Sequence, residues 1–184
     1  MDKKISIILS TYNEAKVIEN TINEIFKHVK DAEIIVVDDN SPDGTLEIVK
    51  KIKSPNLKIF SKKTRGLAAA LLTGLINSSG DVIGWIDSNQ PSLVSKLPDM
   101  ISKLDNYDII TLSRYIEGGG DQRKGIRILS SKIINFYCRL VLGGEIKDYT
   151  SGMFTMKRSV LTHVVPISYG HGEFFIEFLY KAKK

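Results

Sequence analysis

Five short apolar runs of this chain are each followed closely by acidic or basic side chains, and these are the residues that could do chemistry. In order along the chain they are Glu14, Asp38, Asp39, Arg65, Asp87 and Arg114. Carboxylates bind hard cations and hydroxyl groups, whereas a planar guanidinium group binds phosphate oxygens in pairs. A set that contains both kinds of group suits a phosphorylated ligand that is bound together with a metal ion.

The apolar runs predict the elements that bring these side chains together. The runs cover residues 5–9, 34–37, 57–60, 82–86 and 109–112. Continuous apolar runs separated by helical stretches are typical of buried parallel strands. The helical stretches are expected at residues 13–29, 45–53, 66–78 and 93–104. We therefore expect a doubly wound, mostly parallel α/β sheet, which binds its ligand beyond the carboxyl ends of the strands.

The alternation of strand and helix stops after Arg114. A polar, glycine-rich loop at 117–121 precedes a helix expected at 126–142, whose apolar side is unusually broad. Residues 153–157 predict one short strand, and residues 173–182 predict a terminal helix. The second part of the chain therefore differs in organisation from the first.

The composition is that of one folded domain over residues 1–184. The change after Arg114 divides it into residues 1–114, expected to bind an anionic ligand at the strand ends, and residues 115–184, expected to form the other side of the site. Hydrophobic residues make up 42% of the chain and charged residues 26%, which excludes a disordered protein. No run approaches the ~20 apolar residues that a membrane span needs. The N-terminus lacks the long apolar region of a secretory signal, and a single cysteine suits a reducing compartment. These features predict a cytoplasmic protein.

The net charge of +5 favours anionic partners, which include nucleotide phosphates, an acidic lipid surface and nucleic acid. Nucleic acid is disfavoured, because the basic residues are not interleaved with aromatic residues as single-strand binding requires. A dinucleotide oxidoreductase is also disfavoured, since no Gly-x-Gly-x-x-Gly motif follows the first run.

Acidic residues after the first two runs are candidates for binding a nucleoside. The ring of Tyr12 could cover a base while Glu14 accepts hydrogen bonds from base or ribose, although helix capping explains this segment better when it is taken alone. Asp38 and Asp39 are stronger candidates. Two adjacent acids at the end of a buried strand are costly without a partner, and a base N–H or a ribose hydroxyl is suitable.

Asp87 and Asn89 follow the fourth run and could hold a hard cation. Oxygen ligands two residues apart can point the same way and bind a cation between diphosphate oxygens. Asp87 supplies a carboxylate, whereas Asn89 supplies only a neutral amide. The predicted metal site is therefore weaker than one with two carboxylates.

Six segments in collinear order resemble the inverting family-2 glycosyltransferases, and within them the dolichyl-phosphate mannose or glucose synthases. They are STYNE at 10–14, VVDDNSPDGT at 36–45, RGLAAAL at 65–71, SRYIEGGG at 113–120, DYTSGMFTMKRSVL at 148–161 and FFIEFLYKA at 174–182. Each segment alone is weak evidence for the family, but six segments in the same order are specific for it. The resemblance implies a Rossmann-like nucleotide-diphospho-sugar transferase fold, called GT-A. It also implies transfer of mannose or glucose from a GDP- or UDP-sugar to a polyprenyl (dolichyl) phosphate, with inversion.

The resemblance further implies a role for each matching residue. The nucleotide-sugar would be bound by Ser10, Tyr12, Glu14, Asp38, Asp39, Arg65 and Asp87. Asp87 and Asn89 would hold Mg²⁺ or Mn²⁺, and Arg114, Arg127 and Ser131 would bind the acceptor phosphate. Asp87 and Arg114 would be the catalytic residues. A lipid phosphate is already anionic at neutral pH, so its attack needs no strong general base.

The resemblance also implies a place at the membrane. The helix at 126–142 could lie with its apolar side on the cytoplasmic face of the membrane, and so bring the lipid phosphate to the sugar. Packing of the helix on the sheet is the alternative that we favour for about half of its apolar positions. The half at 115–184 ends earlier than relatives commonly do, which leaves a membrane-spanning protein partner as an open alternative.

Two positions depart from the family pattern. Asn89 stands where the usual Asp-Ala-Asp motif has its second carboxylate, and Ser10 stands where relatives have proline. The first change leaves a second class of function open, a non-catalytic binder of sugar nucleotide or lipid phosphate with a weakened metal site. An Asn89→Asp variant should gain metal affinity and activity if the site is only weakened.

Overall fold

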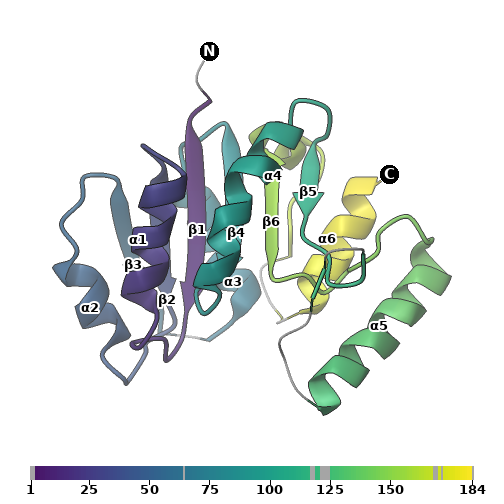
Figure 1. The fold of residues 1–184 in the computed structure, drawn as a ribbon, viewed down its shortest axis with the longest axis horizontal. Helices are drawn as coiled ribbons and strands as arrows, with labels where there is room; N and C mark the ends of the chain where they lie inside the picture. The colour runs from purple at the N-terminus through teal and green to yellow at the C-terminus, as the bar shows by residue number, and fades with distance from the viewer. Residues whose placement is uncertain are drawn as a thin grey trace.

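The structure is a computed structural model that describes residues 3–63, 65–116, 119–120, 125–167, 170 and 172–183. A six-stranded sheet with the order β3-β2-β1-β4-β6-β5 runs through its centre (Figure 1). The strands are β1 (Ile5–Thr11), β2 (Glu33–Asp38), β3 (Leu57–Ser61), β4 (Val82–Asp87), β5 (Ile109–Thr111) and β6 (Met153–Lys157). The helices are α1 (Ile18–His28), α2 (Thr45–Lys51), α3 (Leu67–Asn77), α4 (Leu97–Lys103), α5 (Ile126–Leu142) and α6 (Glu173–Lys183), with 3₁₀ turns η1 (Pro91–Lys96) and η2 (Arg158–Thr162).

The first four strands confirm the predicted parallel arrangement. β1 pairs in parallel with β2 and β4, and β2 pairs in parallel with β3. β6 is different, because it runs antiparallel between β4 and β5. The side chains of β6 are almost all buried, which suits a central strand, whereas the three residues of β5 are half-buried and take the edge.

Alternate residues of the strands build a separate core on each face of the sheet. Ile7 and Leu9 point to the face that α1, α2 and α4 cover, and Ile8 points to the face that α3 and α6 cover. The second face also contains the aromatic cluster around Phe154, whose ring stacks on Phe175 with centroids 5.0 Å apart. Both faces are thus filled, as a doubly wound sheet requires.

Two helices differ from the predicted ranges by more than two residues at one end. α1 begins at Ile18, five residues after the predicted start, because Asn13 has a φ of 59° and cannot be helical. The stretch predicted at 93–104 divides into η1 and α4, and Pro98 lies in the first turn of α4, where its missing N–H costs no hydrogen bond.

α5 has the predicted bounds, but its orientation is unexpected. It lies at the side of the molecule, away from the sheet (Figure 1). Its outward side chains, between 44% and 78% exposed, are Ile126, Leu129, Ile133, Ile134, Phe136, Tyr137, Leu140 and Val141. The expectation that about half of the apolar positions pack on the sheet is therefore wrong. Among the helices that the structure describes, none is long and apolar enough to cross a membrane.

Candidate active site

The polar residues that follow the strands meet at one end of the sheet. The strand register places Ser10 beside Asp87 and Thr11 beside Asp38. A cleft of about 510 Å³ opens at this end, and both halves of the chain contribute to its wall. Its polar lining includes Asp87, Asn89, Gln90, Ser113, Arg114, Thr150 and Ser151. Of the residues predicted for the site, Asp87, Asn89 and Arg114 thus line one cleft.

Asp38 organises the turn that follows β2. Its carboxylate is completely buried, and it accepts hydrogen bonds from Thr11 Oγ1 at 2.9 Å and from Ser41 Oγ at 2.6 Å. The backbone N–H of Ser41 donates a third at 2.9 Å. These partners satisfy a buried charge within the protein. A contact between Asp38 and a nucleoside stays a prediction.

Asp39 ties the end of β2 to the beginning of α3. Its Oδ2 accepts a hydrogen bond from the backbone N–H of Gly66 at 2.8 Å. Its Oδ1 lies 2.7 Å from the ammonium nitrogen of Lys62, and both side chains are largely buried. Asp39 therefore fixes the loop that carries Arg65.

Arg65 and Tyr12, both predicted for the nucleotide site, are in contact. The guanidinium carbon of Arg65 lies 3.3 Å from the centroid of the Tyr12 ring, a cation–π arrangement. The stacking joins the segment after β1 to the segment before α3. The two side chains thus form one surface next to Asp39.

Glu14 links the nucleotide segment to the metal segment. The side-chain amide of Asn89 donates a hydrogen bond to Glu14 Oε1 at 3.1 Å, and Thr45 Oγ1 accepts one from the backbone N–H of Glu14 at 2.9 Å. Burial raises the pKa of Glu14; the hydrogen bond from Asn89 opposes this effect, and the charge of Asp43 adds to it. Glu14 and Asn89 are therefore brought together, as residues of one site should be.

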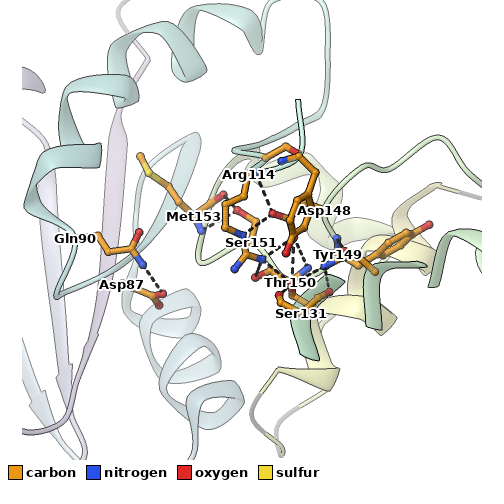
Figure 2. Close-up of polar contacts among 12 residues, drawn as sticks. Asp87, Gln90, Arg114, Ser131, Asp148, Tyr149, Thr150, Ser151 and Met153 are labelled. Atoms are coloured by element: carbon orange, nitrogen blue, oxygen red, sulfur yellow. Dashed lines mark hydrogen bonds and ion pairs between the residues drawn. The ribbon is translucent and has the colours of Figure 1, made fainter. Parts of the chain in front are cut away.

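Asp87 is positioned by the chain just before β6. Its backbone N–H donates to the carbonyl oxygen of Gly152 at 3.1 Å, and Gln90 Nε2 donates to Asp87 Oδ2 at 3.3 Å (Figure 2). A Cβ atom on Gly152 would lie 2.1 Å from Asp87 Oδ2. The carboxylate of Asp87 can occupy its position only because residue 152 has no side chain.

Arg114 is held in the cleft by a buried carboxylate. Its Nε and Nη2 each donate to one oxygen of Asp148 at 2.8 Å, and the Asp148 side chain is wholly buried. Nη2 also donates to Thr150 Oγ1 at 2.6 Å. Burial raises the pKa of Asp148, but the hydrogen bonds and charge of Arg114 outweigh it and hold the pKa below its ordinary value. This bidentate pair fixes the direction of the guanidinium group.

Ser131 reaches the same place from α5. Its Oγ lies 2.9 Å from Thr150 Oγ1, so Arg114 and Ser131 share Thr150 as a partner (Figure 2). The structure therefore brings together two of the three residues predicted for the acceptor phosphate. Arg127 belongs to α5, but its side chain lies outside the described part of the chain.

Several residues that shape the site were not assigned by the sequence analysis. They are Asp43, Asn135, Asp148, Thr150 and Gly152. The signal that could have found most of them is the polar run Asp148-Tyr149-Thr150-Ser151-Gly152, which directly precedes the buried residues of β6. Polar residues at this point cover the end of the sheet where the ligand cleft is expected.

A second cavity of about 710 Å³ lies between β5, η2 and the end of α6. It is larger than the cleft, but none of the residues predicted for the site lines it. The convergence of charged side chains, and not the size of the cavity, identifies the candidate site.

Comparison with known proteins finds relatives that match most of this chain. The chain is 34% identical to the dolichol-phosphate mannosyltransferase of Pyrococcus furiosus, over 98% of this chain and 53% of that protein. It is 29% identical to the polyprenol monophosphomannose synthase of Mycolicibacterium smegmatis, over 86% of this chain and 63% of that protein. The chain thus spans between about half and two thirds of the length of these relatives.

A solved structure shows the same fold. Glucosyl-3-phosphoglycerate synthase from Mycobacterium tuberculosis, in complex with UDP, superposes with a TM-score of 0.72 at 23% identity, over 97% of this chain and 64% of that chain. The predicted mostly parallel α/β fold of the GT-A type is confirmed. The model of the glycosyl transferase family 2 matches residues 6–165. This chain therefore belongs to glycosyltransferase family 2.

Proposed function

We propose that this chain transfers a hexose, mannose or glucose, from a GDP- or UDP-sugar to a polyprenyl phosphate with inversion of configuration. The observation that carries the proposal is the meeting of Arg114 and Ser131 at Thr150, in the wall of the cleft that also contains Asp87 and Asn89. The cleft thus combines a cationic and hydroxyl-bearing side, suited to a phosphate, with an acidic side suited to a metal-bound diphosphate. The names of the two mannosyl-transferring relatives support the same acceptor class.

The donor side of the site is assigned to residues after β1, β2 and β4, of which Asp87 and Asn89 line the cleft. Tyr12 and Arg65 would contact the nucleoside from their stacked arrangement, and Glu14 and Asp39 would accept hydrogen bonds from base or ribose. Ser10 lies beside Asp87 and Asp38 lies beside Thr11, so both are at the same end of the sheet, where they would contribute to binding of the nucleotide-sugar. Asp87 would face the diphosphate.

The residues present fit a divalent cation that is shared with substrate. Among the described residues no group of three or more His, Cys, Asp or Glu could hold a metal ion alone. Mg²⁺ is commonly bound by one or two carboxylates together with substrate phosphates, and Asp87 with Asn89 provides one carboxylate and one amide oxygen. The ion, when bound, would offset charge on the leaving diphosphate. The M. tuberculosis synthase has been solved with Mn²⁺ and UDP-glucose, which supports a divalent ion of this kind.

The acceptor side needs no general base. An oxygen of the acceptor phosphate would form a bond to C1 of the sugar as the bond between C1 and the diphosphate oxygen breaks, and the nucleoside diphosphate would leave with the electron pair. Arg114, oriented by Asp148, would hold the acceptor phosphate in line with C1, and Ser131 and Arg127 would complete its binding. This role is one of binding and orientation.

We further propose that α5 lies on the cytoplasmic face of a membrane. Its exposed apolar residues are accompanied by the exposed Lys132 and Arg139, a pattern typical of helices that bind at a lipid surface. Replacement of Phe136 and Leu140 by serine should abolish co-sedimentation with acidic phospholipid vesicles. Ile76→Ser, which changes an exposed apolar residue of α3, should not. Binding of the chain alone would make a membrane-spanning protein partner unnecessary for attachment.

Calorimetric titration tests the donor side. GDP-mannose and UDP-glucose are each titrated with and without Mn²⁺. Binding of one donor that depends on the metal supports a transferase and identifies the nucleotide. Absence of binding by both donors contradicts the proposal.

One observation favours a second function, a non-catalytic binder of sugar nucleotide or lipid phosphate. Asn89 replaces a carboxylate, and its amide donates a hydrogen bond to Glu14. Donor binding that ignores Mn²⁺, together with no gain of metal affinity in Asn89→Asp, would favour this function over catalysis.

A further inference from the structure

α5 is attached to the rest of the molecule mainly by polar side chains. Among the side chains of α5 that the structure describes, only Ser131 and Asn135 are buried, with 6% and 3% exposed. Cys138 and Leu142 are partly buried against the core. Helices of globular proteins are normally held by a buried apolar face, and α5 turns most of that face outward. Its attachment therefore depends strongly on the polar contacts.

Asn135 makes the largest number of these contacts. Its Nδ2 donates to Thr150 Oγ1 at 2.8 Å and, within α5 itself, to the carbonyl oxygen of Ser131 at 2.9 Å. Its Oδ1 accepts a hydrogen bond from the backbone N–H of Tyr149 at 2.6 Å. Both amide hydrogens and the amide oxygen are thus used. The ring of Tyr149 is completely buried in the core, so Asn135 connects α5 to a fixed point.

A glycine with a positive φ stands at each end of α5. Gly125, before the helix, has a φ of 64°, and Gly143, after it, has a φ of 93°. Glycine has the widest choice of backbone conformations, so these junctions can change direction at low cost. The side-chain contacts in the middle of α5 must then fix where Ser131 lies.

We propose that Asn135 is a positioning residue that locks α5 onto the body of the protein and thereby keeps Ser131 beside Thr150 and Arg114. Asn135 acts through Ser131 and Thr150 and does not touch the acceptor phosphate. The part of the inference that concerns the acceptor rests on the proposed function. The part that concerns the attachment of α5 does not.

Cys138 provides a probe of the attachment. It is the only cysteine of the chain, and it lies on α5, partly buried against the core. Burial raises the pKa of its thiol, so a docked α5 keeps the thiol slow to react. The rate of its modification by a soluble aromatic disulfide at pH 8 is measured in wild type, Asn135→Ala and Asn135→Asp. The aspartate variant keeps the shape of the side chain and an acceptor for Tyr149, but it loses both donors.

The matched control is Ser130→Ala. Ser130 is exposed on α5, and the one partner of its hydroxyl among the described residues is the carbonyl oxygen of Ile126 in the same helix. Both Asn135 variants should raise the Cys138 rate by about tenfold or more, the factor that 1.4 kcal/mol of lost attachment would give. Ser130→Ala should leave the rate unchanged. An unchanged rate in both Asn135 variants would overturn the proposal, as would loss of cooperative thermal unfolding in both.

Steady-state kinetics distinguish a role of Asn135 in positioning the acceptor site from a general effect on the whole protein. The KM for polyprenyl phosphate should rise about tenfold in Asn135→Asp, whereas the Kd for the donor with Mn²⁺ should match wild type. A raised Cys138 rate with an unchanged acceptor KM would contradict positioning of the acceptor site. Wild-type protein that transfers no sugar to the lipid phosphate would refute the proposed function, while the Cys138 rates would still decide the attachment of α5.

Discussion

Residues 1–114, called the donor half because most residues proposed to bind the donor lie there, and the α5 region are built on opposite principles. Around β1 to β4, apolar side chains fill both faces of the sheet, and polar residues appear at the strand ends. α5 reverses this arrangement, since it buries Ser131 and Asn135 and exposes most of its apolar residues. The donor half is therefore held rigid by its packed apolar cores. The position of α5 depends instead on hydrogen bonds and on the surface that contacts its exposed apolar face.

The difference suggests a division of work. A rigid scaffold suits the precise binding of a nucleotide and a metal ion, and an outward apolar helix suits a lipid substrate. Arg114, Asp148 and Thr150 form the junction between the two regions. Arg114 donates hydrogen bonds to Asp148 and Thr150, and Thr150 in turn contacts Ser131 of α5. Changes in the donor half should thus affect donor use, and changes at the junction should affect acceptor use.

Asp87→Ala should have the largest effect on activity. Removal of the carboxylate that is proposed to face the diphosphate should lower turnover by about 100-fold or more and remove the metal dependence of donor binding. The measurement is transfer kinetics with calorimetry of donor binding. Asp99→Ala, which changes an exposed acid on α4, is the control. Full turnover in Asp87→Ala would show that the metal assignment is wrong.

Gly152→Ala should have the next largest effect. The added Cβ would lie 2.1 Å from Asp87 Oδ2, so the carboxylate must move, and turnover should fall by about 10- to 100-fold. Gly144→Ala is the matched control, because a Cβ at that position meets nothing within 4 Å. Equal activity in both variants would mean that the position of Asp87 does not matter.

Asp148→Asn should affect the junction. The loss of the carboxylate leaves Arg114 without its charged partner, which should raise the acceptor KM and lower the free energy of unfolding by about 2 kcal/mol. Because the pKa of Asp148 is below its ordinary value in the fold, the stabilisation is present above about pH 4 and is lost as the pH falls through the folded-state pKa. Denaturant unfolding at pH 7 and at lower pH measures both effects. A donor Kd that changes more than the acceptor KM would contradict the division between the two regions.

Glu33→Gln should have the smallest effect on activity. Glu33 lies at the opposite end of the sheet, where Ser6 Oγ donates to it at 2.5 Å and Lys58 Nζ pairs with it at 2.6 Å. Burial raises the pKa of Glu33, but the bonds from Lys58, Ser6 and Ser79 outweigh it and lower the pKa to about 2. The substitution should cost about 1–2 kcal/mol of stability at neutral pH and leave turnover unchanged. A change in turnover would show that the scaffold is not independent of the site.

Local patterns in the sequence were sufficient for most of the fold. The apolar runs gave the strands, and the ranges of α5 and β6 agree with the structure. The antiparallel insertion of β6 could not be predicted, because strand order depends on contacts between distant segments. The late start of α1 depends on the left-handed Asn13 and on the bond from Ala15 N–H to Asp43, 28 residues away.

The sequence likewise predicts only the part of the candidate site that follows from local patterns. Residues next to strand ends, such as Asp87 and Arg114, could be placed at the cleft from topology alone. The partners of Arg114, which are Asp148 and Thr150, come from a loop 34 to 36 residues later in the chain. The outward apolar face of α5 could not be foreseen either, because periodicity identifies a face without saying what covers it.

Formation of a lipid-linked sugar is the most direct test of the proposed function. The chain is incubated with labelled GDP-mannose or UDP-glucose, Mn²⁺ and a polyprenyl phosphate, and label is measured in the organic phase with and without a chelator. Label is expected in the lipid phase for one donor, and it should be lost on chelation and strongly reduced in Asp87→Ala. Donor binding without any label in the lipid phase would contradict the proposed function.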